Sequence, residues 1–124
     1  MNTITVAGNV VAKPELRFTP SGVAQATLRV AVNRRFQSAG EWKQEATFLS
    51  VVCWSELAEG VADLDKGMKI IVQGRITNRE YEGRDGTKKT ITEIVAEDIG
   101  VSVRKAKKSD RVPSVPSADD EEPF

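Results

Sequence analysis

The sequence predicts an all-β fold: a closed barrel of five strands, with one short helix between the third and fourth strands and a disordered C-terminal tail. Three observations lead to this prediction. Runs rich in Val, Ile and Thr alternate between apolar and polar residues across residues 1–103, and turn residues separate these runs. Only one stretch, after the third run, spaces its apolar residues as a helix does. Beyond residue 103 no periodic apolar pattern remains.

The first three strand candidates lie in the N-terminal half of the chain. The first covers residues 2–11, with Gly8 marking a bulge or a sharp bend. A Pro-Ser-Gly turn at residues 20–22 leads to the second, at residues 23–33, where apolar residues alternate with polar ones. A polar loop through Ser38, Ala39 and Gly40 then leads to the third, at residues 46–54.

The helix candidate follows the third strand. Ser55 is expected to cap it, and Leu57, Val61 and Leu64 recur on one side of it. Gly67, after Lys66, can close it.

The last two strand candidates form a hairpin. They cover residues 68–81 and 88–103, and the glycine-containing segment 82–86 forms the tip between them. Five strands with a helix between the third and fourth fit a small barrel of the OB type, while a two-sheet sandwich is the alternative.

Composition excludes several classes of function. The 18 basic residues are balanced by 18 acidic ones, so bulk positive charge cannot hold a nucleic acid. Histidine is absent, and Cys53 is the only cysteine, which we predict to be buried and inert. Because the usual metal ligands and general bases are therefore missing, we expect no metal site, no catalytic centre and no cofactor. Because no uncharged stretch reaches the ~18–20 residues of a membrane span and no signal segment is evident, we expect a cytoplasmic protein without a membrane partner.

Alternation in the third run gives the clearest functional signal. Leu49, Val51 and Cys53 form the apolar side, which leaves Phe48 and Trp54 facing outward unless they belong to the core of a sandwich. Aromatic rings among cations suit single-stranded nucleic acid, because bases stack on the rings while Arg and Lys neutralise phosphates. Duplex recognition is not favoured, because the only helix candidate is acidic.

Further aromatic and basic side chains extend this candidate surface. Trp42, in the polar loop, is either a stacking residue or a flap over the barrel, and Tyr81 can also be an ordinary edge aromatic. The candidate stacking residues are therefore Phe36, Trp42, Phe48, Trp54 and Tyr81. The candidate phosphate-binding residues are Arg29, Arg34, Arg35, Lys43, Arg75, Arg79, Arg84, Lys88 and Lys89, the last three of which alone would indicate only a solvated hairpin.

The end of the chain predicts a docking peptide on a flexible linker. The linker, residues 104–118, begins with basic residues and contains two prolines but no apolar face. We expect it to be disordered, because it cannot bury enough apolar surface to offset the conformational entropy lost on ordering. An apolar ring and a carboxylate beside acidic residues suit a basic pocket on a partner protein, and a merely solubilising end is the alternative. The predicted docking tip consists of Asp119, Asp120, Glu121, Glu122, Pro123 and Phe124.

Several segments together resemble the bacterial single-stranded DNA-binding protein family. They are residues 2–9, 26–32, 48–59, 66–67, 72–75 and the ending 119–124. The resemblance implies a non-enzymatic homotetramer that wraps single-stranded DNA at the nucleoid and recruits replication, recombination and repair proteins through its acidic tip.

The same resemblance bears on individual residues. It places the stacking aromatics of the family on Phe36, Phe48, Trp54 and Tyr81, whereas Trp42 has no equally firm counterpart. The ending departs from the family because Glu122 stands where many members have an apolar residue or proline, and the linker contains neither Gly nor Gln. The rival functions are an RNA-binding variant and an assembly subunit that buries Phe48 and Trp54 in an oligomer interface.

Overall fold

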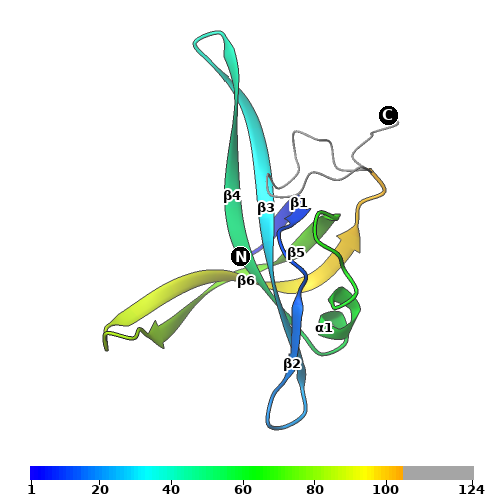
Figure 1. Cartoon of the computed structure of the whole chain (residues 1–124), viewed down its shortest axis with the longest axis vertical. Coiled ribbons are helices and arrows are strands. Elements are labelled where there is room, and N and C mark those ends of the chain that lie inside the picture. The colour runs from blue at the N-terminus through cyan, green and yellow to red at the C-terminus, as the bar shows by residue number, and fades with distance from the viewer. Residues whose placement is uncertain (105–124) are drawn as a thin grey trace.

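The computed structural model describes residues 1–104, so the predicted acidic tip and all but the first residue of the predicted linker lie outside the described residues. Five strands close into a barrel in the order β1, β3, β4, β6, β5 and back to β1 (Figure 1). Their bounds are β1 (Ile4–Val10), β3 (Ala24–Ser38), β4 (Glu41–Trp54), β5 (Lys69–Glu82) and β6 (Lys88–Val101).

Ring closure depends on β1 and on one parallel contact. β1 pairs with β5 from Ile4 to Asn9 and reaches β3 only at Asn9 and Val10. On the other side, β4 and β6 pair in parallel around Val51 and Ile94. The helix lies between β4 and β5 in the chain, so the predicted OB-type barrel is confirmed and the sandwich alternative is wrong.

The barrel interior is filled by the side chains that alternation assigned to it. β-Branched and other aliphatic side chains from all five strands pack together there with Cys53, because successive strand residues point to opposite faces. The largest fully buried apolar side chains are Val10, Val30, Val51, Ile70 and Val72.

Two glycines allow strands to approach closely at the barrel wall. A Cβ on Gly8 would lie 2.5 Å from the carbonyl oxygen of Ala31, where β1 passes from β5 to β3. A Cβ on Gly74 would collide with the carbonyl oxygen of Val95, at the register shift between β5 and β6. The pairing of β1 with β5 runs through Gly8 without a register shift, so the predicted bulge is absent, and Gly8 instead stands at a close approach that only glycine fits.

The helix α1 (Ser55–Val61) begins and ends differently from the prediction. Trp54, the last residue of β4, is its N-cap residue, and no side chain caps the helix. The chain turns directly from strand to helix at Ser55 (φ 57), so the predicted capping role of Ser55 is wrong. The helix also stops well before Gly67, whose N–H donates to the Val10 carbonyl at 2.8 Å.

Two hairpin arms extend from the barrel in different directions (Figure 1). The polar loop predicted before residue 46 is instead strand, because β3 and β4 stay paired as far as Ser38 and Glu41. Ala39 (φ 53) and Gly40 (φ 81) make the tight turn between them. The β5–β6 arm ends at the predicted tip.

A short strand, β2 (Glu15–Phe18), was not predicted. It pairs with the start of β3 and adds an edge strand outside the closed ring. Leu16 and Phe18 do alternate with Glu15 and Arg17, but the run is only four residues long and all four side chains are exposed, so the core imposes no longer pattern on it. Within residues 1–104, no helix has the length and apolar character needed to cross a membrane.

Candidate nucleic-acid interface

Three exposed aromatic side chains line one side of β4. Trp42, Phe48 and Trp54 are spaced six residues apart, and even spacing places them on the same face of a strand. Their exposed fractions are 66%, 45% and 42%, although they are among the largest apolar side chains in the chain. At ~3.4 Å per residue, successive rings are separated by ~20 Å along the strand.

Arginines from β3 lie over two of these rings. The Arg29 guanidinium carbon is 5.5 Å from the centre of the Phe48 ring, and that of Arg35 is 5.5 Å from the centre of the Trp42 ring. Arg29 is opposite Ser50 in the register, diagonal to Phe48, which is within reach of a long side chain. We call this surface, formed by Arg29, Arg35, Trp42, Phe48 and Trp54, the aromatic face. It presents planar groups on which bases can stack, together with two positive charges.

Phe36 does not belong to the aromatic face. It is opposite Lys43 in the register, whereas Trp42 is opposite the next residue of β3, so Phe36 and Trp42 point to opposite sides of the arm. The Arg34 guanidinium carbon lies 5.0 Å from the centre of the Phe36 ring, and its Nη1 is 3.2 Å from Glu45 Oε1. The structure therefore separates Phe36, Arg34 and Lys43 from the other candidates on this arm.

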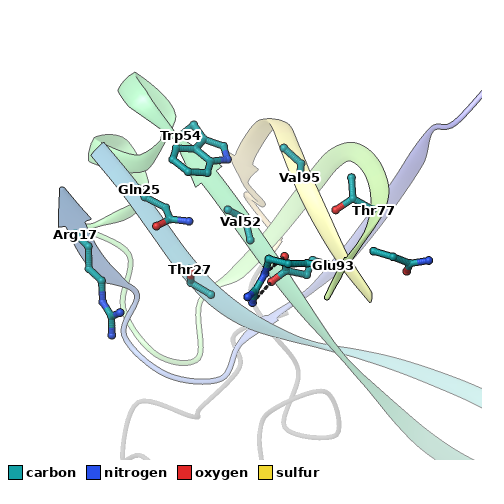
Figure 2. A pocket seen from close by; sticks show the side chains of 10 residues that line it. Arg17, Gln25, Thr27, Val52, Trp54, Thr77, Glu93 and Val95 are labelled. Carbon is teal, nitrogen blue, oxygen red and sulfur yellow. Dashed lines mark hydrogen bonds and ion pairs between the residues drawn. The ribbon is translucent and has the colours of Figure 1, made fainter. Parts of the chain in front are cut away.

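A groove of ≈ 550 Å³ adjoins the aromatic face at Trp54. Figure 2 shows the Trp54 ring at one end of it and Thr77 and Glu93 at the other. β2 and β3 form one side of the groove, β4 its middle, and β5 and β6 the opposite side. It is lined by Arg17, Gln25, Thr27, Val52, Trp54, Thr77, Asn78, Arg79, Glu93 and Val95.

A bidentate ion pair between Arg79 and Glu93 lies within this groove. Arg79 Nε donates to Glu93 Oε1 at 3.1 Å, and Arg79 Nη2 donates to Glu93 Oε2 at 3.3 Å. The Glu93 side chain is 8% exposed, whereas that of Arg79 is 58% exposed. The hydrogen bonds from Arg79, and then the negative charge of Glu93, raise the pKa of the Arg79 guanidinium, so Arg79 stays positively charged.

The β5–β6 arm extends from this end of the groove. Tyr81 is 44% exposed and lies on the same side of β5 as Thr77 and Arg79, opposite Lys89. The structure therefore places Tyr81 on the side of the β5–β6 arm that also carries the groove residues Thr77 and Arg79. Within residues 1–104, no ion pair engages the following predicted cations: Arg29, Arg35, Lys43, Arg75, Arg84, Lys88 and Lys89.

Sequence reasoning did not assign several residues that line the groove. Gln25 and Thr27 alternate outward from β3, and that signal was visible in the sequence. Arg17 could not be placed because β2 was not predicted, and Glu93 lacked any signal that separated it from other acidic residues.

Cys53 lies inside the barrel and not in this interface. Burial raises the pKa of its thiol to about 12, so it stays protonated near neutral pH. Within residues 1–104, no three His, Cys, Asp or Glu side chains come together as metal ligands.

Comparison with known proteins gives consistent matches over the barrel. The sequence model of the "Single-strand binding protein family" matches residues 1–102. "Single-stranded DNA-binding protein 2" of Streptomyces coelicolor is 49% identical over 107 residues, which cover 83% of this chain and 54% of that protein. The "Single-stranded DNA-binding protein" of Corynebacterium glutamicum is 48% identical over 108 residues, covering 84% of this chain and 48% of that protein.

A third relative matches over a larger part of its own length. The "Single-stranded DNA-binding protein" of Mycolicibacterium smegmatis is 49% identical over 108 residues, which cover 84% of this chain and 66% of that protein. The chain thus spans about half to two thirds of the length of these curated relatives.

Proposed function

The chain belongs to the single-strand binding protein family, and we propose that it binds single-stranded DNA with little dependence on base sequence. The observation that carries this proposal is the row of Trp42, Phe48 and Trp54 along β4, exposed on the surface of the barrel and its arm. Every base has a flat π-face, so stacking on such a row is tolerant of sequence. In single-strand binding proteins this stacking typically contributes ~1–3 kcal/mol per base.

Cations on the two arms supply the second part of the proposed mechanism. Arg29 and Arg35 border the stacking rings, while Arg84, Lys88 and Lys89 surround the tip of the β5–β6 arm. We assign these side chains to the phosphates that follow the stacked bases. Because phosphate contacts release counterions, binding should weaken as salt rises.

The proposed assembly is a homotetramer. Two features support self-association: from Ile4 to Gly8, no strand in residues 1–104 pairs with the β1 edge opposite β5, and Ile71 on the neighbouring strand is 45% exposed. An open strand edge beside apolar surface is a site where a second copy can add its own strand.

We assign the protein to replication, recombination and repair at the nucleoid, where single strands arise, and give it no catalytic activity. The acidic tip 119–124 would recruit partner proteins, and its support is the sequence, which joins acidic residues to Pro-Phe.

Intrinsic fluorescence tests the proposed function because the chain has two tryptophans, both on the aromatic face. The full chain is titrated with oligo(dT), oligo(U) and a duplex of equal length. Strong quenching by oligo(dT) and weak quenching by the duplex are expected. Preference for oligo(U) would indicate an RNA-binding protein, and no response to any strand would indicate an assembly subunit whose aromatic face binds protein.

A further inference from the structure

The Arg79–Glu93 pair places a negative charge where a groove for DNA is not expected to have one. Glu93 is the one buried acidic residue among residues 1–104, and it lies in the lining of the groove. A buried carboxylate is costly unless it is paired, and Arg79 pairs with it through two hydrogen bonds of 3.1 and 3.3 Å. The positive charge of Arg79 is therefore offset by Glu93 and is not fully available to a ligand in the groove.

The other charged group in the groove is also compensated. Arg17 Nη2 lies 3.1 Å from Glu15 Oε2, and both side chains are exposed. Both cations in the lining of the groove, Arg17 and Arg79, thus have a carboxylate partner, and only the partner of Arg79 is buried. A route for the sugar-phosphate backbone would need uncompensated cations.

The remaining lining suits bases. The Trp54 ring provides a stacking surface at one end, and Val52 and Val95 contribute apolar surface (Figure 2). Gln25 carries an amide that can donate to and accept from base edges. These are the groups that recognise a heterocycle, and none of them prefers an anion.

We propose that Glu93 cancels the charge of Arg79 in the groove, so that the groove accepts bases while the phosphates pass outside it. This inference rests on the proposed function and specifies how the strand is oriented in the groove. Glu93 is a positioning residue, since it acts through Arg79 and through the charge of the groove. Arg79 then contributes a planar guanidinium next to the bases and does not bind a phosphate.

The test compares the salt dependence of oligo(dT) binding by four full-length proteins: wild type, Glu93→Gln, Arg79→Gln/Glu93→Gln and Glu59→Gln. Glu93→Gln keeps the shape and a hydrogen-bond acceptor for Arg79 but releases one positive charge into the groove. One added phosphate contact steepens the plot of log K against log salt by ~0.7 for a single strand. The affinity of Glu93→Gln relative to wild type should therefore fall by about 2.6-fold as salt rises from about 50 to about 200 mM.

The double variant separates this inference from the alternative in which Arg79 binds a phosphate. Removing both charges leaves the net charge of the groove unchanged, so the inference expects the wild-type slope. If Arg79 contacted a phosphate in the wild type, the double variant would have a slope shallower by ~0.7. The double variant leaves no guanidinium without its carboxylate partner, so it gives a result even if Glu93→Gln alone does not fold.

Glu59→Gln is the matched control for net charge. Glu59 is exposed on α1, outside the groove, and changing it to Gln alters the net charge of the protein by the same amount. Its slope should equal that of the wild type. An equal steepening in Glu59→Gln and Glu93→Gln, or no steepening in Glu93→Gln, would overturn the inference, whereas wild-type protein that fails to bind oligo(dT) would overturn the proposed function itself.

Discussion

Replacing Trp54 with alanine should weaken binding of single-stranded DNA more than replacing any one exposed lysine. Trp54 is 42% exposed, and its ring forms one end of the groove. Loss of one stacked base costs ~1–3 kcal/mol, which corresponds to a dissociation constant raised about 5-fold to about 140-fold. An exposed ion pair contributes at most ~1 kcal/mol.

The assay is fluorescence anisotropy of labelled oligo(dT) titrated with the full chain at two salt concentrations. Because stacking is not an ionic interaction, the loss in Trp54→Ala should persist at the higher salt, whereas the effect of a lysine substitution should shrink. Trp54→Phe keeps an aromatic ring and should retain most of the affinity. Thermal melting of both variants is needed as well, since Trp54 is also the N-cap residue of α1.

Phe18 provides a matched aromatic control. It is 61% exposed on β2 and lies beside Glu56 and Glu59 of α1, outside the groove. Phe18→Ala should change the dissociation constant by less than about twofold, because no stacking surface of the proposed interface is lost. If Trp54→Ala bound as tightly as wild type, or if Phe18→Ala lost as much affinity as Trp54→Ala, the assignment of stacking to Trp54 would be refuted.

Two further predictions concern the barrel. Gly74→Ala should lower the free energy of unfolding by ~2 kcal/mol or more, measured by denaturant melting, because its Cβ would collide with the Val95 carbonyl oxygen. Gly60→Ala, on α1 with open space around it, should instead raise the free energy of unfolding by up to ~1 kcal/mol. Equal effects of the two substitutions would contradict the close approach at Gly74. Cys53, with its pKa raised to about 12, should resist iodoacetamide at pH 8 in the native protein and react once guanidinium unfolds it. Only above about pH 12 does the thiolate dominate in the folded state, so rapid labelling of native protein at pH 8 would show that Cys53 is not held in the core.

Strands were predictable where one face is buried. Val30 and Val51 face the core, while their chain neighbours Arg29 and Ser50 face outward. The sequence therefore alternates between apolar and polar residues in these strands, which makes them recognisable. The outer part of the β3–β4 arm lacks such a contrast because most of its residues are exposed on both faces. The sequence therefore suggested a loop where the backbone is a regular hairpin.

Because the sequence suggested a loop in place of the β3–β4 arm, the position of Trp42 could not be predicted. Read as a loop residue, Trp42 could equally well have stacked on DNA or covered the barrel. The register, which places Trp42 opposite Gln37, shows that it shares a face with Phe48 and Trp54. The same register places Phe36 on the other side of the arm, which its basic neighbours could not indicate.

The pairing of Arg79 with Glu93 could not be predicted from the sequence at all. It depends on the register of the β5–β6 hairpin, in which Arg79 is opposite Ile91 and diagonal to Glu93. A shift of the register by one residue would point one of the two side chains to the other face of the hairpin. The sequence suggested phosphate binding for Arg79 from its charge alone, and only the structure shows the buried carboxylate of Glu93 on which our proposal of a neutral groove rests.

The most direct test of the central claim is quenching of each tryptophan separately by single-stranded DNA. Trp42→Phe leaves Trp54 as the one tryptophan of the chain, and Trp54→Phe leaves Trp42. If bases stack along the aromatic face, oligo(dT) should strongly quench the emission of both variants, and a duplex of equal length should not. Oligo(dT) that binds without quenching either tryptophan would show that the strand lies elsewhere on the protein and would contradict the proposed stacking.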